Sequence, residues 1–100
     1  MGLNVILQGY IIVPDEDMDR VLKALPKHIE LTRKESGCIV FNVEQDEDNK
    51  HRFNVYEEFE STESFELHQL RVRSSYWGEI TQNVERHYTV EAISTKELRQ

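Results

Sequence analysis

The sequence lacks residues on which several classes of protein depend. It has a single cysteine, Cys38, which excludes an intramolecular disulfide and a cysteine-based zinc site. No run approaches the roughly 18 apolar residues that a membrane-spanning helix needs. The N-terminus also has no charged stretch followed by a long apolar run. From these features we predict a cytoplasmic protein with no membrane partner.

Positive charge is scarce as well. The chain of 100 residues has 19 Asp and Glu against 12 Lys and Arg, which gives a formal net charge of −7. Its densest basic patches are the pairs Arg33/Lys34 and Arg71/Arg73. Nucleic acids and anionic membranes both need a positive footprint larger than these pairs provide. We therefore expect no nucleic-acid partner.

The sequence contains no motif for a metal or a nucleotide cofactor. Its four histidines, at positions 28, 51, 68 and 87, are far apart, and the acidic loop Glu44–Asp48 lacks the calcium-loop pattern. A glycine-rich phosphate loop, a dinucleotide fingerprint and a Ser-His-Asp order are also missing. We expect no metal, nicotinamide or flavin site, and hence no cofactor.

Four segments have the pattern of β-strands. Val5–Val13 is almost continuously apolar, which favours a strand buried on both faces. In Cys38–Gln45, residues Ile39, Phe41 and Val43 recur at every second position and so share one face. Arg52–Phe59 alternates in the same way, so that Glu57 shares a face with the apolar residues and Tyr56 lies on the other face. The last predicted strand is Val84–Ile93.

Between these strands lie helical patterns. Apolar residues including Val21, Leu22 and Leu25 recur at helical spacing from Met18 to Thr32, after an acidic start at Asp15–Asp17. Pro26 lies inside this pattern, so we expect a kink or a break there. A second helix begins after the N-cap Ser61, with Phe65, His68 and Val72 on one stripe. A short helical segment at Ser74–Gln82 follows.

The order β-α-β-β-α-β predicts an α+β fold of the ferredoxin-like type with an antiparallel sheet and both helices on one face. We expect one domain over residues 1–100, with a core at about 5–93 and a polar tail at 94–100. The other sheet face would be open in a monomer and would carry several apolar residues. Such a face predicts a homodimer with sheet packed on sheet. Its residues are Tyr10 or Ile11, Val40, Tyr56, and Tyr88 or Val90, depending on register.

Glu57 and His68 are the main candidates for chemistry. Strand parity and the helix stripe direct them toward one interior from opposite sides. A carboxylate beside an imidazole under apolar cover can orient the ring and keep its pKa near neutrality, so that the pair could abstract a phenolic proton. A buried polar pair that satisfies only its own hydrogen bonds would have the same spacing.

Two further residues have alternative interpretations. Trp77, the only tryptophan, suits stacking on a flat aromatic substrate at a pocket mouth, but it equally suits anchoring the short helix in the core. Cys38 has no basic neighbour in sequence, which favours a small buried apolar side chain over a nucleophile.

Several of these residues together resemble the antibiotic biosynthesis monooxygenase family. The resemblance covers about residues 5–90 and rests on Glu35-Ser-Gly-Cys38, Phe41, the run Phe53-x-Val-Tyr-Glu57-x-Phe59-x-Ser61, Phe65 and His68. It implies a dimeric α+β barrel. It also implies oxidation of a quinol or small phenol by molecular oxygen without metal or flavin, because a deprotonated phenol is electron-rich enough to react with oxygen.

Carried over to this sequence, the resemblance implies that His68 accepts the proton and that Glu57 orients it. Trp77, Tyr56 and Phe41 are expected as walls of a substrate pocket between the sheet and the helices. Two other functions remain open. One is a non-oxidative isomerase of a small polar metabolite, which a pocket lined by Lys and Arg would favour. The other is a non-catalytic dimeric binding or stress module, which a filled core without a cavity would favour.

Overall fold

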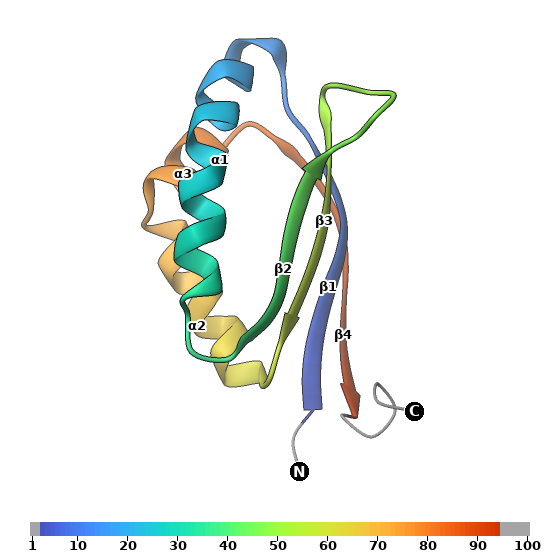
Figure 1. Ribbon diagram of the computed structural model, residues 1–100, viewed down its shortest axis with the longest axis vertical. Helices are drawn as coiled ribbons and strands as arrows, with labels where there is room; N and C mark the ends of the chain where they lie inside the picture. Colours follow the sequence, from blue (N-terminus) through green and yellow to red (C-terminus); the bar gives the residue numbers. More distant parts are fainter. Residues whose placement is uncertain (1–2, 95–100) are drawn as a thin grey trace.

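All helices lie on one face of a four-stranded antiparallel sheet (Figure 1). The computed structural model describes residues 3–94. Its strand order is β2-β3-β1-β4, so the ferredoxin-like α+β prediction is confirmed. The elements are β1 (Leu3–Ile12), a 3-10 turn η1 (Asp15–Asp17), α1 (Met18–Arg33), β2 (Cys38–Gln45), β3 (Arg52–Phe59), α2 (Thr62–Arg73), α3 (Tyr76–Ile80) and β4 (Glu85–Ser94).

The strand register determines which side chains face the helices. β1 and β3 pair Leu7 with Glu57 and Ile11 with Phe53. Because side chains alternate across a strand, Glu57 shares the helix side with Phe53. This side holds the core, in which Phe53 and Phe59 are fully buried. Burial of one such side chain stabilises the fold by roughly 1.5–3 kcal/mol.

The first helix runs without a break from Met18 to Arg33, so the predicted break at Pro26 is absent. Proline removes the bond that residue 26 would donate to the carbonyl of Leu22. Both residues are exposed, and water can therefore take the place of this donor. On the predicted apolar stripe, Val21 is fully buried, whereas Leu22 is 42% exposed.

A bulge in β2 alters one predicted face. Cys38 pairs with Phe59 and Val40 pairs with Glu58, so Ile39 is the extra residue between them. Ile39 is 42% exposed, and its predicted place on the face of Phe41 is wrong. Sequence alternation cannot reveal this bulge, because one inserted residue shifts the parity only locally.

The turn before β2 is fixed against the start of α2. Gly37 has φ +92°, a left-handed conformation that favours glycine. A Cβ at this position would lie 2.5 Å from the Cβ of Ser64. Nearby, Ser61 caps α2 as predicted, since its side chain accepts a hydrogen bond from the Ser64 amide. The end of the first β-α unit therefore packs directly on the second.

The open sheet face is more polar than predicted. Tyr10, Val40 and Tyr56 do lie on it, by strand parity and register. Ile11 and the β4 residues Tyr88 and Val90 instead lie on the helix side, where the helices leave β4 partly uncovered. The polar tail predicted for residues 94–100 falls outside the described residues, except that Ser94 ends β4.

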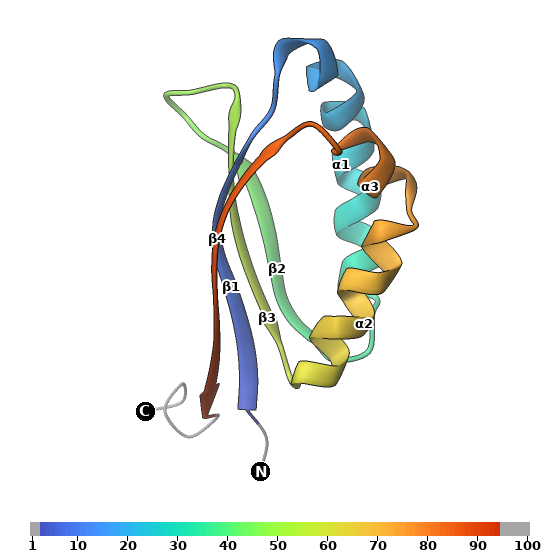
Figure 2. The same ribbon diagram turned by 180° about the vertical axis from the view of Figure 1, so that it is seen from behind.

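Seen from behind, the helices lie along one side of the sheet, and β4 is the edge strand nearest the viewer (Figure 2). None of the helices within residues 3–94 has both the length and the apolar character needed to cross a membrane.

Candidate functional site

The site is built around His68 on α2. The cap at Ser61 fixes where this helix begins, and the stripe of Phe65, His68 and Val72 then faces the sheet. His68 is 97% buried, since only 3% of its surface is exposed. Its ring lies against Phe59 at 4.9 Å and Phe41 at 5.7 Å between ring centres. The imidazole is therefore held between two aromatic side chains.

A series of charged side chains holds the Nδ1 edge of the His68 ring. His68 Nδ1 lies 2.7 Å from Glu35 Oε1, and Arg71 Nε donates to Glu35 Oε2 at 2.5 Å. Arg71 also donates to the hydroxyl of Thr32 at 2.9 Å. A carboxylate paired with a guanidinium is an acceptor, so the proton on Nδ1 is the one that His68 donates. This tautomer leaves Nε2 as the nitrogen with the lone pair.

Glu57 faces that second nitrogen. Its Oε1 lies 3.7 Å from His68 Nε2 and has no hydrogen-bond partner within residues 3–94. Burial, together with the smaller effect of the charge of Glu35, raises the pKa of Glu57 to about 8. Near neutral pH the Glu57 carboxyl is therefore largely protonated, and it stands just beyond hydrogen-bond distance of Nε2.

Two opposing effects act on the pKa of His68. Burial lowers this pKa, whereas the hydrogen bond and the charge of Glu35 raise it. The net shift is downward, so the ring is neutral at physiological pH. A neutral imidazole with its free nitrogen toward a protonated carboxyl can accept a proton from a third group placed between them.

A second histidine extends the cluster away from Glu57. His28 of α1 lies 6.4 Å from His68 between ring centres and stacks on Trp77 at 4.5 Å, with only 5° between the ring planes. Burial lowers the pKa of His28 to about 3, with smaller contributions from His68 and Arg71. Its Nδ1 is buried and has no hydrogen-bond partner within residues 3–94. His28 therefore separates Trp77 from His68.

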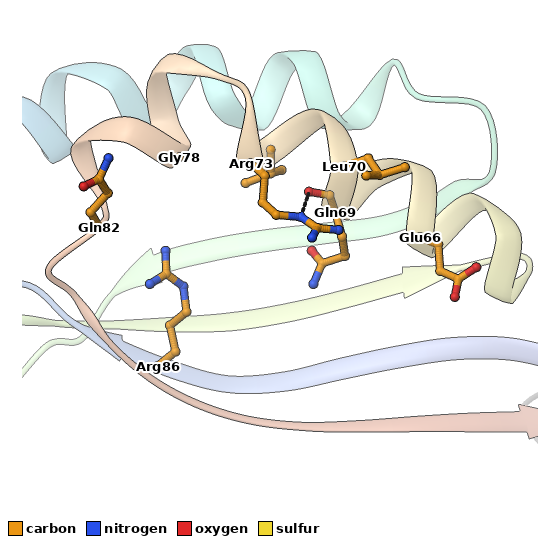
Figure 3. A pocket seen from close by; sticks show the side chains of 8 residues that line it. Glu66, Gln69, Leu70, Arg73, Gly78, Gln82 and Arg86 are labelled. Carbon is orange, nitrogen blue, oxygen red and sulfur yellow. Dashed lines mark hydrogen bonds between the residues drawn. The ribbon is translucent and has the colours of Figure 1, made fainter.

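Two hollows lie beside this cluster. The first, which we call the helix–sheet cleft, has a volume of about 740 Å³ and lies between α2, α3 and β4 (Figure 3). Arg86 rises into it from β4, and Gln69 and Arg73 reach it from α2. Gln69 directly follows His68 in the chain, so the cleft runs beside the helix that carries the buried imidazole.

The second hollow, which we call the helical groove, has a volume of about 500 Å³ and lies between α1 and the pair α2–α3. Arg71 reaches it from α2, and Trp77 reaches it from α3. His28 forms part of its lining, and neither His68 nor Glu57 does.

The structure brings together three of the five residues nominated from sequence. His68, Glu57 and Phe41 meet in the interior. Trp77 lies behind His28 on the helical groove. Tyr56 pairs with Gln8 and Asn42 and has the opposite parity to Glu57, so it lies on the open sheet face and not at this site.

The sequence interpretation missed Glu35, Arg71 and His28 as members of the cluster. His28 was detectable, because it lies seven residues after Val21 and four before Thr32 on the buried stripe of α1. Arg71 lies three residues after His68 and thus on the same side of α2. Glu35 lies in a turn, where no periodicity indicates direction.

The same cluster does not provide a metal site. Within residues 3–94, no three His, Cys, Asp or Glu side chains are placed to hold a metal ion. Burial raises the pKa of the Cys38 thiol, and the charges of Glu35 and Glu57 raise it further, which agrees with an unreactive thiol.

Comparison with known proteins identifies the family. The family model described as antibiotic biosynthesis monooxygenase matches residues 4–72, and the chain belongs to this family. The uncharacterised protein YjcS of Bacillus subtilis (strain 168) is 32% identical over 68 residues. The match covers 68% of this chain but 65% of YjcS, which is less than two thirds of that relative.

Solved structures share the fold. A candidate antibiotic biosynthesis monooxygenase from Nitrosomonas europaea superposes with a TM-score of 0.73 at 18% identity, covering 94% of this chain and 91% of the other. MupZ from Pseudomonas fluorescens gives a TM-score of 0.74 at 18% identity, covering 99% of this chain and 74% of MupZ. At these identities the likeness concerns the fold alone.

Proposed function

We propose that the protein is a cofactor-independent monooxygenase that oxidises a quinol or a small phenol with molecular oxygen. One observation carries the proposal: the buried His68 ring is held by Glu35 at Nδ1 and has its unprotonated Nε2 free beside Glu57. This is the arrangement that a general base requires, in a dry apolar setting. Membership of the family supports the same chemistry.

In the proposed mechanism His68 Nε2 accepts the phenolic proton, and the positive charge that forms on the ring is stabilised by Glu35. The Arg71 guanidinium fixes the Glu35 carboxylate in turn, so in this mechanism Glu35 takes the orienting role that the family resemblance implies for Glu57. The neutral Glu57 carboxyl can donate a hydrogen bond to the phenolate oxygen. The electron-rich phenolate then reacts with oxygen.

The helix–sheet cleft is the proposed entrance for the substrate. Arg86 lines it, and Tyr88 lies two residues further along β4 on the same side of the sheet. Burial, together with the smaller effect of the charge of Glu57, raises the pKa of Tyr88 to about 12. Tyr88 therefore lies on the side of the sheet that also carries Glu57. Phe41 contributes an apolar wall on the far side of His68.

The test is oxygen uptake by metal-depleted protein with a panel of quinols and polycyclic phenols. We expect uptake with at least one compound and a loss of at least about 100-fold in His68→Gln, since general-base catalysis contributes about 10²–10⁴-fold. His51→Gln, in the β2–β3 loop away from His68, is the matched control and should retain full activity. Uptake that is absent across the panel, or equal in His68→Gln and the wild type, contradicts the proposal.

A second candidate function is the isomerisation of a small anionic metabolite. The observation that favours it is the basic lining of the helical groove, to which Lys23, Lys27 and Arg71 contribute. An enzyme of this kind would bind its substrate in the groove and would consume no oxygen. Product analysis under anaerobic conditions distinguishes the two reactions.

We also propose that the protein forms a homodimer through its open sheet face. Tyr10, Val40 and Tyr56 lie on this face and are only partly buried. A face with aromatic and apolar residues among polar ones has the composition of a protein–protein interface.

A further inference from the structure

The helical groove has the opposite charge to the protein as a whole. The chain has a net charge of −7, yet the side chains lining the groove include four cations, Arg20, Lys23, Lys27 and Arg71, and no carboxylate. Three of the cations come from successive turns of one face of α1. A local positive field in an acidic protein selects anionic ligands.

The four cations are not equally available. Arg20 pairs with Asp17, Lys27 lies 2.9 Å from Glu30, and Arg71 is bound to Glu35. Lys23, in contrast, has no ion pair within residues 3–94. The groove thus offers one free ammonium, and Arg71 remains 31% exposed beside it. This supply of charge suits a single carboxylate better than a multiply charged ligand.

The rest of the groove is aromatic. Tyr76 is 61% exposed and Trp77 is half-buried, and the ring of His28 supports Trp77 from within by stacking at 4.5 Å. Aromatic surface next to cations recognises flat rings, which stack on the indole or phenol while their charged group meets the cation. A volume of about 500 Å³ accommodates one small molecule.

We propose that the helical groove is a binding site for a small aromatic carboxylate, with its ring against Tyr76 and Trp77 and its carboxylate toward Lys23 and Arg71. The site is distinct from the His68 centre, because His28 and Trp77 lie between the groove and that imidazole. The two remain linked, since Arg71 lines the groove and also holds Glu35. The binding site is inferred from the groove alone and does not depend on the reaction proposed for His68.

The single tryptophan of the chain supplies a direct test. Trp77 fluorescence is titrated with 4-nitrobenzoate and with the neutral analogue 4-nitrobenzamide, with correction for absorption by both compounds. We expect saturable quenching by the carboxylate, weaker binding at high salt, and at least about fivefold weaker binding of the amide. Linear quenching, or equal affinity for the two compounds, overturns the proposal.

Two charge-matched variants locate the site. Lys23→Gln removes the free ammonium and should weaken 4-nitrobenzoate binding about two- to fivefold, the range expected for an exposed ion pair. Lys50→Gln removes the same charge in the β2–β3 loop and should leave binding unchanged. Equal effects in the two variants overturn the proposal. Displacement of 4-nitrobenzoate by inorganic phosphate at the same concentration also overturns it, because the groove would then recognise negative charge alone and not an aromatic ring.

Discussion

His68 and Glu35 are 33 residues apart in sequence, and their side chains meet at 2.7 Å. The contact joins the turn after α1 to the middle of α2, and it connects the two β-α halves of the fold at the proposed reaction centre. Since Arg71 holds the other oxygen of Glu35, the geometry of the imidazole depends on three side chains from two segments.

The first prediction concerns the titration of His68. Glu35 raises the pKa of this ring against the effect of burial, so Glu35→Gln should move the titration midpoint to lower pH. Arg71, no longer neutralised, acts in the same direction. NMR of the imidazole resonances measures the shift. Glu63→Gln, in the exposed first turn of α2, is the control, and a midpoint that is unchanged in Glu35→Gln would contradict the assigned contact.

The second prediction concerns stability as a function of pH. Folded protein keeps a proton on Glu57 up to pH about 8, whereas unfolded chains release it near the ordinary value of 4.5. Unfolded protein therefore binds fewer protons between these values, and Glu57 lowers the free energy of unfolding as the pH rises, by up to roughly 1.4 kcal/mol per pH unit.

Replacement of Glu57 by Gln removes this dependence and preserves the size of the side chain. Relative to wild type, Glu57→Gln should thus become progressively more stable from pH 5 to pH 8, as measured by urea unfolding. The exposed Glu60→Gln variant provides the baseline. A stability difference that is constant over this range would show that Glu57 titrates normally.

The third prediction concerns the turn at Gly37. Gly37→Ala places a Cβ in a left-handed conformation and against Ser64, and it should lower the free energy of unfolding by about 1–3 kcal/mol. Ser36→Ala, at the exposed neighbouring position, should change it little. Denaturant unfolding compares the two variants, and equal stabilities would contradict the tight turn.

The fourth prediction concerns association. Tyr10 lies on the open sheet face, with the Arg52 guanidinium 3.7 Å from its ring centre. Tyr10→Asp should weaken the dimer without unfolding the chain, because the new carboxylate can pair with Arg52. Light scattering at micromolar concentration follows the change. Leu67→Asp, on the exposed surface of α2, should remain dimeric. A monomeric wild type would refute the proposed dimer.

The strands were the most predictable part of the molecule. The bounds of β2 and β3 are the same as those predicted from the alternation of apolar and polar residues, because both strands bury one face and lie next to clear turn residues. The same parity was informative about sites. It placed Glu57 on the face toward His68, and it placed Tyr56 on the other face, which conflicted with the use of Tyr56 as a pocket wall.

The contacts that hold the site were less predictable. Glu35 approaches His68 only because a turn brings it there, and local periodicity carries no information about such a long-range pairing. The bulge at Ile39 and the uninterrupted helix at Pro26 depend on backbone geometry and on solvent exposure, which a linear pattern does not record.

The absence of a side chain at Gly37 also affects the contact between Glu35 and His68. It allows the segment carrying Glu35 to rest directly on Ser64, one helical turn before His68. The position of the Glu35 carboxylate relative to the His68 imidazole thus depends on Gly37, which contacts neither group. A Cβ at Gly37 would therefore disturb the contact between Glu35 and His68 as well as the turn.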